Sequence, residues 1–147
     1  MPQSETERAA GYLIKRVQQA LRRRCDAALK PAGLSMSQYA VLRALSDHPK
    51  ASAAELARLC FVTRQSLQDV LGGLRTDGLV APASQSAAGR AQCLQLTPRG
   101  HSRLDMGGAA MSTVESAMTQ GLSKKKRDEL SNLLTLCAQN LEAETYR

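Results

Sequence analysis

The sequence predicts a mainly α-helical fold with a small β-wing, and three observations point to it. Apolar residues recur at helical spacing along most of the 147 residues, and several of these segments open on a capping pattern. Aromatic residues make up only 3% of the chain, so the core must come from aliphatic and small side chains. One short segment, residues 90–97, alternates apolar and polar residues as a half-buried strand does.

The first predicted helix spans about residues 6–29. It opens on a capping-box pattern of Ser4 and Glu7, and Pro31 and Gly33 end it. Its apolar face comprises Leu13, Ile14, Val17, Leu21, Cys25 and Ala28.

The next three predicted helices form a compact group. One opens on the Ser35–Gln38 capping pattern, with Tyr39, Leu42 and Leu45 directed inward. The following one opens on Ser52, and its buried face consists of Leu56, Leu59 and Cys60. After a tight turn, Thr63 caps a helix over residues 64–76 whose apolar face consists of Leu67, Val70, Leu71 and Leu74. Two short helices so joined form a helix-turn-helix unit.

A β-hairpin is predicted directly after that unit. Gly78 ends the preceding helix, and Leu79–Val80 is a short strand. A loop over residues 82–89 leads to the strand over residues 90–97, in which Leu94 and Leu96 share one side. The hairpin is the wing of a winged helix-turn-helix.

Two long helices complete the chain. One runs from Pro98 to about Gln120, with Gly107–Gly108 weakening its middle, and Ser123 caps the last. The inward face of the last helix comprises Leu130, Leu133, Leu134, Cys137 and Leu141. A small winged unit cannot cover the apolar faces of the first and last helices, so we expect a homodimer. This predicts a DNA-binding domain at residues 34–97 and a helical dimerisation region at residues 1–33 and 98–147.

Composition limits the function further. The net charge of +7 favours a polyanionic partner. Neither a secretory signal nor a membrane-spanning run is present in the sequence, so we expect a cytoplasmic protein. The sequence has no nucleophile elbow, phosphate-binding glycine loop or paired metal-ligand spacing, so we expect no enzyme, cofactor or metal site.

The outer face of the 64–76 helix suits the major groove of DNA. Gln65 and Gln68 carry amides that pair with adenine edges, and Arg64 can bind guanine or phosphate. Asp69 either accepts a cytosine amine or orients a neighbour such as Arg64. We expect Ser52, Thr63 and Ser66 to contact phosphates and Arg90 of the wing to enter the minor groove. A symmetric pair of chains then predicts an inverted-repeat DNA site.

Four sequence blocks, in this order, resemble the MarR family of bacterial transcription regulators: LSMSQYAVLRAL, ASAAELARLCFV, LQDVLGGLRTDGLVAP and GRAQCLQLTPRGHSRL. The resemblance implies a homodimer that represses a promoter. It also implies release from DNA by a small aromatic or phenolic effector or by thiol oxidation. A pocket between the dimerising helices and the winged unit then involves Arg16, Tyr39 and Arg43.

The cysteines have two interpretations. Cys25, Cys60 and Cys137 lie on apolar stripes and are expected to act as small hydrophobic residues. Cys93, on the outer side of the wing strand, is the candidate reactive thiol.

The chain departs from the family pattern at three places. Ala88 replaces an acid in the wing, Gln68–Asp69 replaces a frequent Thr-Arg pair, and Gly72–Gly73 replaces larger residues. Segment 63–77 consequently has no formal net charge. An alternative therefore stays open: a non-catalytic winged-helix interaction module that reads DNA weakly and binds protein or RNA.

Overall fold

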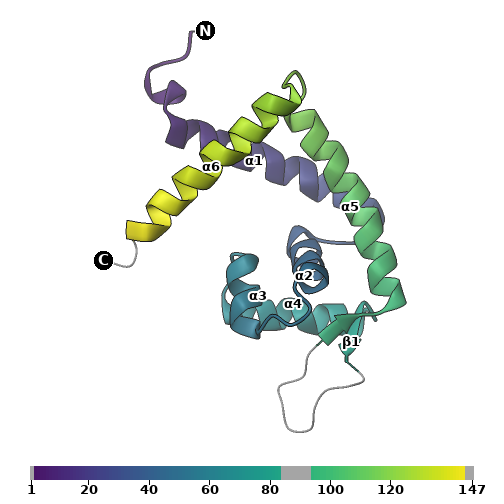
Figure 1. Cartoon of the computed structure of the whole chain (residues 1–147). Helices are drawn as coiled ribbons and strands as arrows, with labels where there is room; N and C mark the ends of the chain where they lie inside the picture. Colours follow the sequence, from purple (N-terminus) through teal and green to yellow (C-terminus); the bar gives the residue numbers. More distant parts are fainter. Residues whose placement is uncertain (1, 84–93, 145–147) are drawn as a thin grey trace. The chain divides into compact units, whose positions relative to one another are not determined.

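The computed structural model describes residues 2–83 and 94–144 (Figure 1). Residues up to Val114 form one compact unit, and residues from Glu115 onward form a second. In chain order the elements are η1 (Thr6–Arg8), α1 (Ala10–Leu29), η2 (Lys30–Ala32), α2 (Met36–Asp47), α3 (Ala53–Leu59), α4 (Arg64–Thr76), β1 (Val80–Pro82), β2 (Leu94–Leu96), α5 (Pro98–Met118) and α6 (Lys124–Glu144). The predicted class, mainly α with a small two-stranded wing, is confirmed.

The start of the chain differs from the prediction of a single helix from residue 6. The Ser4–Glu7 capping box forms, with the Ser4 N–H donating to Glu7 Oε2 at 2.7 Å and the Glu7 N–H to Ser4 Oγ at 3.3 Å. It caps only the 3-10 turn η1. Ala9 is then extended, with ψ 140°, so α1 begins at Ala10.

The core of the first unit lies where α2, α3, α4 and the hairpin meet (Figure 1). Leu42, Leu67 and Leu74 are fully buried in it. The predicted Ser35–Gln38 capping box at the start of α2 is confirmed, because both of its hydrogen bonds form. The prediction that Leu59 is buried is wrong, because its side chain is 47% exposed. Leu59 lies on the last turn of the seven-residue helix α3, which packs through Leu56 and Ala57.

Thr97 anchors the wing to the end of α4. Its hydroxyl donates to the Gly78 carbonyl at 2.7 Å, its N–H donates to the Leu79 carbonyl at 3.0 Å, and its Oγ1 accepts the Gly100 N–H at 3.0 Å. The two strands pair antiparallel, with Val80 opposite Leu96. The first strand is Val80–Pro82 rather than Leu79–Val80, so Pro82 ends a strand instead of opening the loop.

The paired glycines of α5 have a packing role that the sequence did not reveal. A Cβ on Gly107 would lie 2.8 Å from Tyr39 Cδ2, and one on Gly108 would lie 2.9 Å from an Arg43 guanidinium nitrogen. Glycine therefore allows α5 to approach α2 closely. The expected weakening of the helix does not interrupt α5, which runs unbroken to Met118 rather than Gln120.

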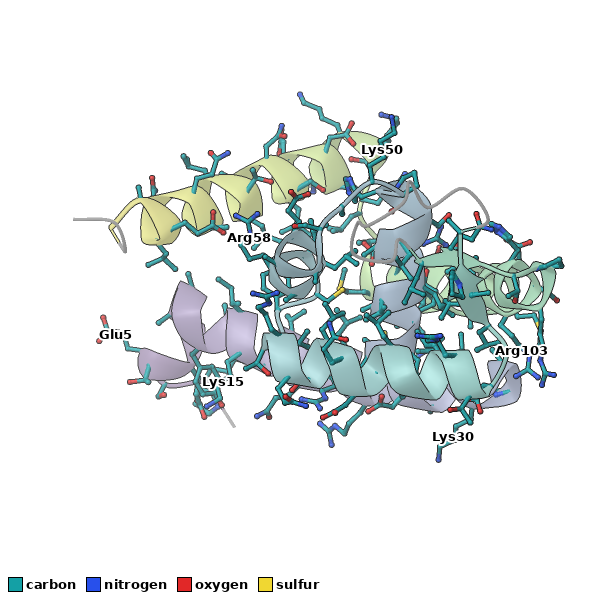
Figure 2. All side chains as sticks on the ribbon, turned by 90° about the horizontal axis from the view of Figure 1, so that it is seen from below. Glu5, Lys15, Lys30, Lys50, Arg58 and Arg103 are labelled. Atoms are coloured by element: carbon teal, nitrogen blue, oxygen red, sulfur yellow. The ribbon has the colours of Figure 1, made fainter. Side chains whose placement is uncertain are left out.

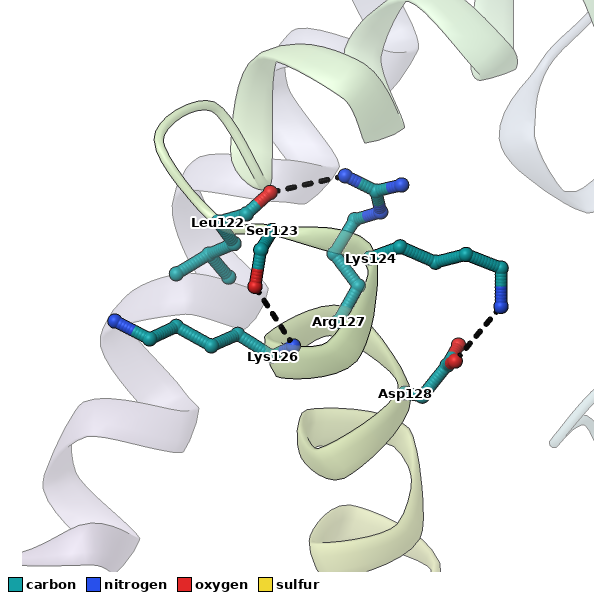
Figure 3. A network of polar contacts seen from close by, with 6 residues as sticks. All are labelled: Leu122, Ser123, Lys124, Lys126, Arg127 and Asp128. Atoms are coloured by element: carbon teal, nitrogen blue, oxygen red, sulfur yellow. Dashed lines mark hydrogen bonds and ion pairs between the residues drawn. The ribbon is translucent and has the colours of Figure 1, made fainter.

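The second unit contains the end of α5, a turn and α6. Gly121 takes a left-handed φ of 89° in the turn. Figure 3 shows the start of α6: Ser123 Oγ accepts the Lys126 N–H at 3.2 Å, Arg127 donates to the Leu122 carbonyl at 2.9 Å, and Lys124 pairs with Asp128 at 2.9 Å. The cap on Ser123 is confirmed.

The apolar face of α6, for which the sequence predicts a partner in a second copy of the chain, is exposed in the single chain. Leu133 is 61% exposed, Leu134 45% and Leu141 71%, and Cys137 is exposed as well. On α1, Ile14 and Val17 are each 47% exposed. The pattern identified apolar faces correctly, but within one chain these faces are not covered.

Candidate nucleic-acid interface

Helix α4 separates an apolar from a polar face. Its Leu67 and Leu74 are fully buried and Leu71 is nearly so. The predicted bounds of this helix, Arg64–Thr76, are confirmed. The predicted DNA-contacting residues within the described chain are all exposed: Ser52, Thr63, Arg64, Gln65, Ser66, Gln68 and Asp69. The structure therefore presents this set on the surface, on and beside one helix.

Local hydrogen bonds fix the start of α4. Thr63 Oγ1 accepts the Ser66 N–H at 3.0 Å, which confirms Thr63 as the N-cap. The Thr63 hydroxyl also donates to Ser66 Oγ at 3.0 Å. Because Thr63 uses its proton for this bond, Ser66 retains the hydroxyl proton that is free to reach a phosphate.

The amides on the exposed face differ in their partners. Gln65 Nε2 donates to Asp69 Oδ1 at 3.2 Å, one turn along the helix. Asp69 thus orients Gln65, a neighbour other than Arg64. Among the described residues, the Gln68 side chain has no hydrogen-bond partner, so both its donor and its acceptor remain available for a base edge.

A hollow of about 590 Å³ lies beside α4. Ser52, Arg64 and Gln68 line it, and so do Lys50 and Arg75, which sequence reasoning missed. Its lining within the described chain contains three cations and no carboxylate. Arg75 follows Gln68 by seven residues, so helical spacing already placed it on that face. Figure 2 labels Lys50 at the loop before α3.

The turn between α3 and α4 contains an unusual residue. Phe61 has a φ of 56°, the only positive value at a non-glycine residue in the described chain. Its N–H donates to the Arg58 carbonyl at 3.2 Å, and the Val62 N–H donates to the Ala57 carbonyl at 3.0 Å. This is a Schellman motif, which usually has glycine at the left-handed position. A residue with a side chain costs about 1–2 kcal/mol there.

Two predicted sites in the wing fall outside the described residues. Arg90 and Cys93 both lie in the stretch 84–93, so their roles stay predictions. The described part of the wing is its base, where Leu96 is buried and Gln95 is exposed. The predicted alternation of this strand is confirmed over residues 94–96.

The predicted effector residues are only partly brought together. Arg43 donates to the Tyr39 hydroxyl at 3.3 and 3.4 Å, and its guanidinium lies 5.7 Å from the centre of the Tyr39 ring. The hydrogen bond to Tyr39 raises the pKa of Arg43 above its ordinary value. Arg16 instead lines a separate hollow of about 240 Å³, together with Glu7 and Tyr12.

The described cysteines differ in exposure. Cys25 is fully buried, which suits a small hydrophobic residue, whereas Cys137 is exposed. Burial raises the pKa of the Cys60 thiol, so less of the nucleophilic thiolate is present at neutral pH. Among these three, only Cys137 is exposed.

The described residues include neither a cluster of metal ligands nor a helix that could cross a membrane. No group of three His, Cys, Asp or Glu side chains there lies close enough together to hold a metal ion. None of the described helices has the length and apolar character needed to cross a membrane.

Comparison with known proteins gives the family. Residues 32–91 match the model of the MarR family. The HTH-type transcriptional repressor Rv2887 of Mycobacterium tuberculosis is 35% identical over 124 residues, which cover 84% of this chain and 89% of the relative. The crystal structure of that MarR family protein in complex with salicylic acid superposes with a TM-score of 0.73 at 33% identity, covering 88% of this chain and 96% of that one. Its complex with DNA gives a TM-score of 0.71 at 32% identity, covering 88% and 97%. The chain therefore belongs to the MarR family of winged helix-turn-helix transcription regulators.

Proposed function

We propose that this protein is a homodimeric repressor that binds an inverted-repeat DNA site through α4 and the wing and is released by a small aromatic effector. The exposed polar face of α4, opposite a fully buried leucine face, carries the proposal. A helix with this division enters the major groove and presents amides to base edges. The described chain thus has a surface suited to reading sequence.

The site residues divide into two roles in this proposal. Gln65, Gln68 and Arg64 read base edges in the major groove, and Arg90 of the wing enters the flanking minor groove. Ser52, Thr63 and Ser66 set the register by contacting phosphates. Lys50 and Arg75 extend the cationic surface around the hollow, which supports phosphate contact there. The complex of Rv2887 with DNA supports a duplex as the partner.

Self-association is supported by apolar surface. The exposed leucines of α6 and the exposed Ile14 and Val17 of α1 belong to helices outside the predicted DNA-binding domain. Leaving such faces in water is unfavourable, and a second copy of the chain covers them economically. A two-fold dimer also presents two α4 helices to successive turns of the duplex.

The effector is proposed to be a small aromatic acid. Tyr39 and Arg43 supply a ring and a cation at the place where α2 meets Gly107 and Gly108 of α5. The complex of Rv2887 with salicylic acid supports this class of ligand. Release by oxidation of Cys93 is the second candidate trigger, and the position of this residue on the outer side of the predicted wing strand favours it.

A binding selection from randomised duplexes tests the function. We expect enrichment of an inverted repeat whose half-sites lie about one helical turn, roughly 34–36 Å, apart. Native mass spectrometry should find two chains on each duplex, and affinity should fall steeply with salt. A chain that enriches no sequence and binds duplexes without salt dependence would instead be an interaction module for protein or RNA.

A further inference from the structure

Phe61 is the most exposed of the large apolar residues described in the chain. Its side chain is 92% exposed, and it is the only phenylalanine in the sequence. It lies at the left-handed position of the turn between α3 and α4, where glycine is the favoured residue. Neither the backbone conformation nor packing within the described chain therefore explains why this position carries a phenylalanine.

The surroundings of Phe61 suit a polyanion. Two residues later Thr63 caps α4, so Phe61 lies in the turn that leads directly into this helix. Between residues 56 and 68 the sequence contains Arg58 and Arg64 and no acidic residue. Arg58 is labelled on α3 in Figure 2. The exposed ring thus lies in a segment of the chain, between α3 and the start of α4, whose only formal charges are positive.

A DNA duplex offers one apolar group on its base edges. The C5-methyl of thymine lies in the major groove, and phenylalanine is among the side chains that contact it. Residues at the N-terminal end of a recognition helix are those that reach base edges. Phe61 lies two residues before Thr63, the N-cap of α4, in the turn that leads into this helix.

We infer that the Phe61 ring packs against a thymine methyl in each half-site, next to the base pairs that α4 reads. This inference rests on the proposed function and adds a specificity-determining residue to it. Phe61 contributes apolar discrimination, which the amides of Gln65 and Gln68 do not supply.

The test combines protein and DNA changes. A duplex selected with the wild-type protein is rebuilt with uracil replacing each thymine in turn, which removes only the methyl group. The variants Phe61→Gly and Phe61→Asn remove the ring and retain residues that tolerate a left-handed backbone. Affinities are measured by fluorescence anisotropy at one salt concentration, with thymines outside the repeat as the control positions.

We expect one uracil position per half-site to weaken wild-type binding about fourfold, which corresponds to ~0.8 kcal/mol for one buried methylene-sized group. Both variants should bind the thymine duplex more weakly and should be insensitive to that position. Phe61→Gly should also melt at a higher temperature than the wild type, because glycine relieves the backbone.

Each other outcome has a distinct meaning. If the wild type binds its selected repeat, but the variants bind equally well and no thymine matters, the inference is overturned while the proposed function stands. If the variants bind weakly yet remain as sensitive to every uracil as the wild type, a thymine contact is likewise overturned. A wild type that selects no duplex removes the proposed function itself.

Discussion

Replacing Gly100 by alanine should destabilise the junction between the wing and α5. A Cβ at this position would lie far inside van der Waals contact of the Leu79 carbonyl oxygen and 3.4 Å from Leu96 Cβ. That oxygen belongs to the backbone and accepts the Thr97 N–H at 3.0 Å. Because the nearest atoms belong to the backbone of Leu79, which cannot move aside as a flexible side chain can, α5 must shift away from Leu79.

The magnitude follows from three contributions. Overpacking costs about 1–3 kcal/mol, and weakening the hydrogen bond to a buried carbonyl costs about 1–3 kcal/mol. The higher helix propensity of alanine offsets about 1 kcal/mol of this loss in the free energy of unfolding. The central expectation is a loss of about 3 kcal/mol, which for a chain of this size lowers the melting temperature by about 6–12 °C.

Gly72→Ala is the matched control, because it makes the same change within a helix. Among the described residues, and apart from the backbone of α4 itself, a Cβ on Gly72 meets no heavy atom within 4 Å. Only helix propensity therefore changes, and Tm should rise by about 2–4 °C. Both variants are melted by circular dichroism at equal protomer concentration, since dimerisation makes Tm concentration-dependent. A Gly100→Ala protein that melts within about 2 °C of the wild type would refute the proposed close approach.

Three further predictions concern binding, assembly and thiol exposure. Arg75→Ala should weaken binding to all duplexes alike and should reduce the dependence of log affinity on log salt concentration by about 1 per lost phosphate contact. Lys15→Ala makes the same charge change on α1 and should leave this salt dependence unaltered. Equal salt dependence for the two variants would remove Arg75 from the interface. Leu133→Glu should shift the protein toward monomer in analytical ultracentrifugation because it charges the exposed apolar face of α6, whereas Thr135→Glu, on the opposite side of the helix, should not. A thiol reagent followed by mass spectrometry should find Cys25 unmodified in the folded protein because it is fully buried, and rapid labelling there would contradict its place in the core.

The sequence predicted best those elements whose ends are determined locally. The bounds of α4 were correct because Thr63 caps its start, Gly78 follows its end and its leucines recur at helical spacing. The capping boxes were likewise read from residues three apart. At the N-terminus the same signal was present, but it caps a 3-10 turn, since Ala9 interrupts the helix.

Long-range packing could not be read in this way. Gly107 and Gly108 look like helix-weakening residues in the sequence, and only their distance to Tyr39 and Arg43 reveals a close approach of two helices. Helical periodicity identified the apolar face of α6, whose leucines are exposed in the single chain, but it could not say which residues pack against that face. Leu59 shows the same limit on a short helix, where the apolar stripe extends past the residues that pack.

The candidate interface was predictable in part. Helical periodicity gave the exposed face of α4, but Arg75 was missed although it shares a stripe with Gln68. The pattern of apolar residues did not single out Phe61, because only the structure shows its left-handed backbone angle and its exposed ring.

The most direct test of sequence reading by α4 is a parallel binding selection with the wild type and Gln68→Ala. The structure leaves the Gln68 amide without a partner among the described residues, so its loss should erase the preference at one base pair per half-site and cost about 1–3 kcal/mol there, with all other positions unchanged. Identical preferences for the two proteins would contradict the proposal that this face of the helix recognises bases.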